Sequence, residues 1–158
     1  MEENASREAS HSLRGPTDRG ALCDFRDVFE EMEPLADGTL DDIIDPSELN
    51  IQLDDGIGAA ESARLDIDWT THNDYNIHYT DADGRDLRWD LHPNDFPAAS
   101  DERHFHPPPN ASSDSEDVEE SCIERRGIEL VARATQKLWR KAYRDESFTG
   151  INRAVDPP

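Results

Sequence analysis

The stretch 74–107 gathers the residue types that could do chemistry, including four of the six histidines: His78, His92, His104 and His106. Arg88 and Asp90 stand between them. Imidazole titrates near neutral pH and can act as a general acid or base, while guanidinium can hold a phosphate or an oxyanion. These six residues are therefore our candidate catalytic set.

The same histidines also allow a metal-binding hypothesis. His104-Phe105-His106 in an extended backbone would project both imidazoles to one side, and His92 or Asp90 could complete a set of donors for Zn, Ni or Fe. No helix fixes these ligands, so the pattern is much less specific than H-E-x-x-H. We assign no metal ligand and expect no cofactor. A purely structural role is the third alternative, with His92 shaping the strand exit before Pro93.

Two predicted strands must position the candidate set. Tyr75, Ile77 and Tyr79 alternate along the first, a turn follows at 81–84, and Leu87, Trp89 and Leu91 alternate along the second. Alternating residues point to opposite faces of a sheet, so the apolar side chains share one face. The other face then gathers the polar residues Asn76, His78, Arg88, Asp90 and His92.

Other elements are predicted on both sides of this pair. The spacing of Phe25, Val28, Phe29 and Met32 predicts a short helix over 24–35, capped by Asp24. Alternation predicts strands at 49–53 and 63–70, the second with Asp66 and Asp68 facing outward. The fold class is α+β: an antiparallel sheet of about four strands in meander order, with a short N-terminal helix and a long C-terminal helix packed on one face.

The predicted C-terminal helix begins at a capping box, Ser121-Cys122-Ile123-Glu124, and ends near Asp145. It contains Gly127, at a cost of about 1 kcal/mol relative to Ala. The predicted organisation is a disordered tail over 1–20, a helix and sheet over 21–107, an acidic Ser/Pro linker without fixed structure over 108–120, the helix over 121–147 and a tail over 148–158.

A basic ridge follows one side of this helix, made by Arg126, Arg133, Lys137, Arg140 and Arg144. At 100° per residue these side chains fall within about 60° of arc, beside the apolar stripe. The ridge could pair with the chain's own carboxylates, bind a nucleic acid backbone or dock an acidic protein.

The composition indicates the environment more than the partner. The chain has 158 residues, 37 acidic against 16 basic, and a net charge of −21. Such acidity is typical of a cytoplasm that holds molar salt, where the screening length falls to about 3 Å and self-repulsion costs little. The apolar runs are too short to span a membrane, and no secretory core is present, so we expect a cytoplasmic protein with reduced Cys23 and Cys122.

The order of motifs over residues 63–107 resembles the TumE-type family of toxin-antitoxin toxins. The family pattern has an aromatic-x-Tyr strand, an acidic-Gly turn, an Arg-aromatic-Asp strand and a His-x-His element. The matching positions here are Tyr79, Gly84, Arg88, Asp90, His104 and His106. One departure is that His92 precedes Pro93, where the family places proline first.

The resemblance implies a toxin-like component with a cognate antitoxin, commonly a helix-turn-helix DNA-binding protein. RNA is the expected target, because His, Arg and Asp together can activate a ribose 2′-OH and stabilise a pentacoordinate phosphate without a metal. A chain of this charge would associate with RNA only where salt screens it. The alternatives are a non-catalytic protein-interaction module of a halophilic cytoplasm and a small His-based metal-binding protein.

Overall fold

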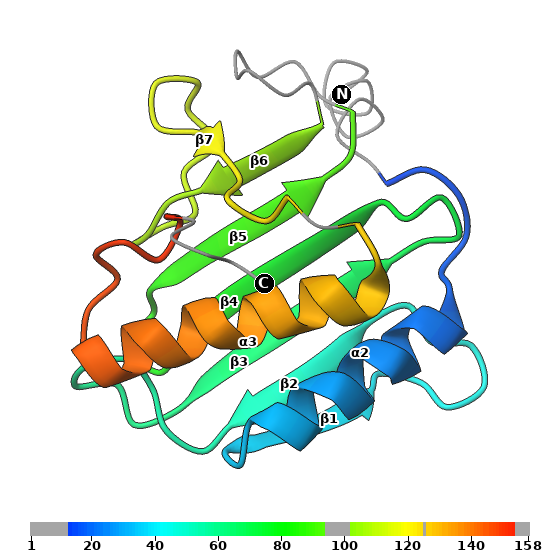
Figure 1. Cartoon of the computed structure of the whole chain (residues 1–158), viewed down its shortest axis with the longest axis horizontal. Helices are drawn as coiled ribbons and strands as arrows, with labels where there is room; N and C mark the ends of the chain where they lie inside the picture. The colour runs from blue at the N-terminus through cyan, green and yellow to red at the C-terminus, as the bar shows by residue number, and fades with distance from the viewer. Residues whose placement is uncertain (1–12, 94–101, 125, 154–158) are drawn as a thin grey trace.

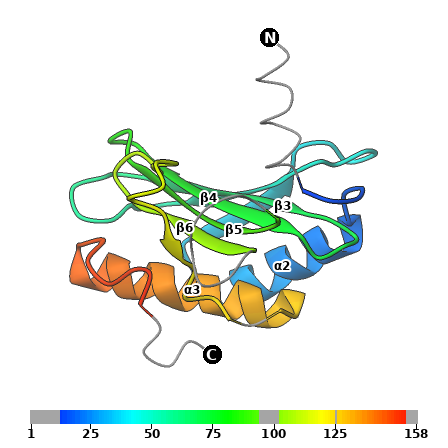
Figure 2. The ribbon, with the colours of Figure 1, turned by 90° about the horizontal axis from the view of Figure 1, so that it is seen from above.

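The computed structural model describes residues 13–93, 102–124 and 126–153. Its architecture is α+β, with an antiparallel sheet whose one face is covered by two helices (Figures 1 and 2). The strands lie in the sheet in the order in which they occur in the chain, as the meander prediction requires. Over the residues that the structure describes, however, the sheet has seven strands, and the prediction of about four is wrong.

The sheet extends beyond the predicted centre on both sides. Its strands are β1 Ala36–Leu40, β2 Leu49–Leu53, β3 Ala63–Trp69, β4 Tyr75–Asp81, β5 Asp86–Leu91, β6 Arg103–His106 and β7 Glu119–Glu120. The additional strands are β1 and β7 at the two edges of the sheet and β6, which lies next to β7. There the alternation of apolar and polar residues that identifies a strand is weakest.

The central pair has the predicted orientation. Tyr79 and Trp89 are both about 1% exposed and belong to the same core, which also contains Phe25, Phe29 and Val131 from the two helices. Trp69 and Tyr75 stack at 4.8 Å between ring centroids. The aromatic side chains therefore face the helices, and the polar residues of β4 and β5 lie on the opposite face.

The N-terminal helix α2 is Arg19–Met32, five residues earlier than its predicted start. Its cap is Asp18, whose side chain accepts a hydrogen bond from the backbone N–H of Ala21 at 3.0 Å. Leu22 extends the apolar stripe of Phe25 and Phe29 by one turn, so the helix has enough core contact to begin there.

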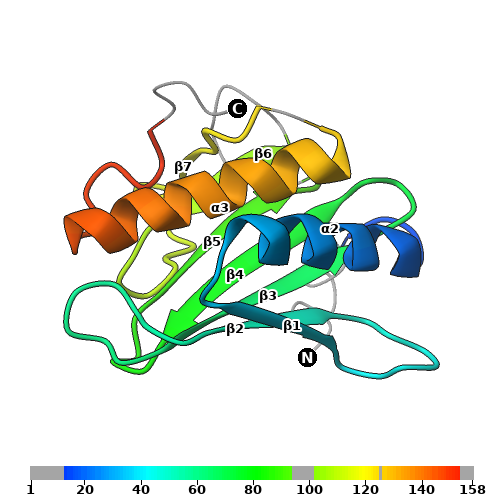
Figure 3. The same cartoon turned by 60° about the horizontal axis from the view of Figure 1, so that its bottom comes forward.

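The C-terminal helix α3 is Ile128–Asp145, so the capping box at Ser121 does not start it. The Ser121 hydroxyl instead accepts a local hydrogen bond from the N–H of Ile123, whose side chain is buried in the core. Gly127 is the N-cap rather than an interior residue, and the expected interior cost does not apply. The two helices lie side by side across the sheet (Figure 3).

The connection after β6 is held against the sheet, in contrast to the expected linker without fixed structure. The N–H of Asp86 donates to the carbonyl of Pro109 at 2.7 Å, and the N–H of Ala111 donates to the carbonyl of Asp86 at 3.0 Å. The predicted tails also contribute contacts. Arg14 pairs with buried Asp74 at 2.8 Å, and Phe148 packs edge-on against Tyr79. Residues 1–12 and 154–158 lie outside the described part.

Candidate functional site

The strand register brings the candidate residues together on the polar face of the sheet. His78 on β4 lies opposite Arg88 on β5, and Arg88 lies opposite His106 on β6. In the next row, Asp90 lies opposite His104. Directly opposed residues have Cβ atoms about 5 Å apart, so side chains from three strands meet here.

Asp90 is the centre of this polar face. Its carboxylate accepts a hydrogen bond from Arg88 Nε at 2.9 Å and lies 2.9 Å from His106 Nε2 and 3.6 Å from His92 Nε2. With its amide oriented to donate, Asn76 places its nitrogen 2.8 Å from Asp90 Oδ1. Burial would raise the pKa of Asp90, but the hydrogen bonds from His106 and His92 and the Arg88 charge outweigh it. The pKa of Asp90 is therefore held well below its usual range, and this carboxylate is a fixed negative charge.

Two of the buried histidines, His106 and His92, are positioned by backbone carbonyls as well as by Asp90. His106 Nδ1 lies 2.9 Å from the carbonyl of Ser112 in the connection after β6. A carbonyl oxygen only accepts, so Nδ1 carries a proton. His92 Nδ1 lies 3.0 Å from the carbonyl of Pro93, and although burial lowers the pKa of His92, the hydrogen bonds to Asp90 and Pro93 give a net rise.

Burial divides the six candidate residues into two groups. Asp90, His92, His104 and His106 are at most 3% exposed, whereas the side chains of His78 and Arg88 are 36% and 33% exposed. His78 Nε2 lies 2.8 Å from Asp86 Oδ2. Of these six candidates, the ones that a large substrate can reach are therefore His78 and Arg88, with the buried group behind them.

The family model described as Toxin TumE matches residues 25–143, which is well over half of the chain and includes the whole of this polar face. This chain belongs to the TumE toxin family. Comparisons with curated proteins and with solved structures found no match. As a member of a toxin family, the chain is a toxin component, and the family implies an antitoxin partner.

The toxin has a further carboxyl group on this face whose role the sequence did not reveal. Asp68 on β3 lies opposite Asn76 and next to Glu48, which precedes β2. Burial, with the nearby Glu48 carboxyl group, raises the pKa of Asp68 to about 7. Asp68 can thus gain or lose a proton near neutral pH. Its outward position in the strand was visible in the sequence, but its proximity to Glu48 depends on how β2 pairs with β3.

The raised pKa of Asp68 leads to a testable prediction about how the free energy of unfolding depends on pH. The folded toxin holds this proton more tightly than the unfolded chain, whose Asp pKa is about 3.9, so stability falls as pH rises from about 4 to about 7. Asp68→Asn removes this loss. We expect the variant to exceed the wild type by on the order of 1–2 kcal/mol near pH 8, after allowance for solvent screening, and to match it near pH 4. Urea unfolding at constant salt measures both values.

Asp83→Asn is the matched control, because Asp83 lies in the β4–β5 turn with a side chain that is 47% exposed. Its effect should be small at either pH. A stability difference between Asp68→Asn and the wild type that stays constant from acid to alkaline pH would contradict the assignment of the proton to Asp68.

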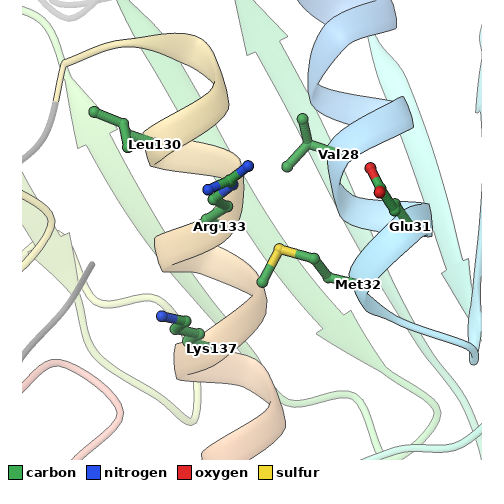
Figure 4. Close-up of a pocket in the computed structure, with 6 residues that line it drawn as sticks. All are labelled: Val28, Glu31, Met32, Leu130, Arg133 and Lys137. Carbon is green, nitrogen blue, oxygen red and sulfur yellow. The ribbon is translucent and has the colours of Figure 1, made fainter.

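The basic ridge is distributed differently from the helical prediction. Arg126 precedes the first residue of α3 and is exposed, and Arg144 is exposed in the last turn. Arg140 pairs with buried Glu33 at the end of α2. Arg133 and Lys137 are exposed on α3, where they line a pocket together with residues of α2 (Figure 4).

Two further features bear on the alternatives left open by the sequence. Within residues 13–93, 102–124 and 126–153, no group of three or more His, Cys, Asp or Glu side chains has an arrangement that could hold a metal ion. Over the same ranges, no helix combines the length and the apolar character needed to cross a bilayer.

Proposed function

We propose that this toxin cleaves RNA without a metal, using the exposed edge of the polar sheet face. The observation that carries the proposal is the direct cross-strand pairing of His78 with Arg88, both accessible, in front of buried Asp90 and His106. Arg88 is fixed from behind by Asp90 at 2.9 Å and lies 3.2 Å from His106 Nε2. Asp90, His92, His104 and His106 are positioning residues in this proposal.

His78 has the environment of a general base. In its neutral form, a hydrogen bond from Nε2–H to Asp86 leaves the lone pair on Nδ1. This Nδ1 takes the proton of a ribose 2′-OH, the 2′ oxygen bonds to phosphorus, and the bond from phosphorus to the 5′ oxygen breaks. Arg88 stabilises the charge on the non-bridging phosphate oxygens.

The leaving oxygen also needs a proton, and Asp68 is suited to supply it. Asp66 lies opposite His78, so Asp68 is a diagonal neighbour of His78, at about 7–8 Å between Cα atoms. A carboxyl group with a pKa of about 7 is protonated in a substantial fraction of molecules at neutral pH. The products are a 2′,3′-cyclic phosphate and a 5′-hydroxyl end.

A matched pair of oligonucleotides tests this proposal. A labelled RNA is incubated with the toxin in molar KCl, because the net charge of −21 repels RNA when it is not screened. We expect cleavage that continues in the presence of a chelator and leaves a 2′,3′-cyclic phosphate. The same RNA with a 2′-deoxy nucleotide at the cleaved position should resist. Cleavage of the deoxy substrate, or loss of cleavage with the chelator, would contradict the mechanism.

A non-catalytic interaction module is the second candidate, and one observation favours it. Four of the six candidate catalytic residues named from the sequence are buried. Burial is also expected if these residues form a hydrogen-bonded network that only stabilises the fold. This candidate predicts that growth inhibition occurs without RNA cleavage. The antitoxin in both cases is proposed to be a helix-turn-helix protein.

A further inference from the structure

The two helices form a groove on the side of the protein away from the polar sheet face (Figure 4). Its volume is about 390 Å³. The lining residues are Val28, Glu31 and Met32 from α2 and Leu130, Arg133 and Lys137 from α3. None of them belongs to the polar sheet face described above.

The groove has apolar side chains from both helices. Leu130 is 41% exposed. Among the described residues, Ile43 and Ile44 are the only other large apolar side chains that are exposed to this extent or more. Val28 and Met32 are half-buried on the opposite wall. Exposed apolar surface that is flanked by charged residues is typical of a protein interaction site.

The charges on the two walls have opposite signs. Arg133 and Lys137 are exposed on α3, and over the described ranges neither forms an ion pair, whereas Arg140 on the same ridge is held by Glu33. Glu31 is exposed on α2. In a chain with a net charge of −21, two unneutralised cations beside an apolar surface attract an acidic partner.

We propose that this groove binds an amphipathic helix of the cognate antitoxin. The apolar face of that helix contacts Val28, Met32 and Leu130, its carboxylates face Arg133 and Lys137, and a basic side chain faces Glu31. Helix-in-groove recognition uses this combination of an apolar seam and charged edges. An RNA strand fits the groove less well, because the apolar side chains offer its phosphates no hydrogen bonds and Glu31 repels them.

The inference rests on the antitoxin partnership that the family implies, and it is independent of the proposed RNA chemistry. It adds that the antitoxin contacts the toxin on the helical face, on the other side of the sheet from His78 and Arg88. A variant altered in the groove should therefore lose its antitoxin and keep its toxicity.

The test is a charge reversal with purified cognate antitoxin as the probe. Arg133→Glu/Lys137→Glu is compared with Arg144→Glu/Arg153→Glu, which makes the same change in net charge at two exposed arginines outside the groove. We expect the groove variant to bind the antitoxin about tenfold more weakly or worse, and the control within about threefold of the wild type. Unfolding midpoints of both variants should match the wild type, because all four residues are exposed.

Growth inhibition and RNA binding distinguish the remaining outcomes. The groove variant should inhibit growth like the wild type but no longer be neutralised by the antitoxin. Equal weakening in the groove and control variants would mean that only net charge matters and would overturn the inference. Loss of RNA binding with unchanged antitoxin binding would assign the groove to RNA instead. Failure of the RNA cleavage test alone would leave these binding results intact.

Discussion

Replacing His78 by alanine is expected to slow RNA cleavage by about 10²- to 10⁴-fold, which is the usual contribution of a positioned general base. The side chain is 36% exposed and its ring contacts Asp86, so its loss removes little packing. The unfolding free energy should stay within about 0.5 kcal/mol of the wild type. Initial rates on a labelled RNA and growth inhibition in cells measure the two expected losses of activity.

His72→Ala provides the control for this prediction. His72 is an exposed histidine in the turn between β3 and β4, outside the polar face, and its replacement should leave cleavage unchanged. Equal rates for His78→Ala and the wild type would exclude His78 as the base. Equal losses in both histidine variants would indicate an effect unrelated to the sheet face.

Replacing Arg140 by alanine is expected to destabilise the fold by about 3 kcal/mol. Arg140 Nε donates to the carboxylate of Glu33 at 2.8 Å, and its guanidinium also pairs with the second oxygen. Glu33 is 1% exposed, so the substitution leaves a buried carboxylate with Gln136 and the N–H of Leu35 as its remaining donors. The midpoint of urea unfolding measures the loss.

Arg144→Ala on the same helix is the matched control, with an expected change below about 0.5 kcal/mol because Arg144 is exposed. Adding Glu33→Gln to Arg140→Ala should recover part of the lost stability, since the unpaired buried charge is then absent. If Arg140→Ala were no more destabilising than Arg144→Ala, the ion pair would not join the two helices as described.

The centre of the fold was predictable because its pattern is local. Alternating Tyr75, Ile77 and Tyr79 and alternating Leu87 and Trp89 are enough to assign two strands and the polar face between them. The two helices follow from apolar stripes in the same way. Their starting residues were wrong because Ser121 and Asp24 are good caps by type, and only the tertiary contacts of Ile123 and Leu22 decide where each helix begins.

The edges could not be predicted in this way. β1 contains Asp37-Gly38-Thr39, which reads as a turn, yet it pairs with β2 along its full length. Gly38 is needed because a Cβ there would lie 2.7 Å from Arg26 Cγ of α2. The contact between position 38 and Arg26 forms only when α2 folds back onto the sheet. No local sequence pattern predicts it.

The candidate site was only partly predictable for the same reason. The residue types on the polar face followed from alternation, but their accessibility did not. His106 is covered by the connection that supplies Ser112, a segment whose composition suggested an unstructured linker. The proximity of Asp68 to Glu48 depends on strand register, which the sequence left undetermined.

The pairing of Glu33 with Arg140 has a consequence for the order of folding. Each strand pairs with its neighbour in the chain, so the sheet can form by successive short-range closures. Glu33 and Arg140 are 107 residues apart, and their contact must wait for a long closure. We therefore expect the helix pair to assemble last, from an intermediate whose aromatic sheet face is still open to water and prone to self-association.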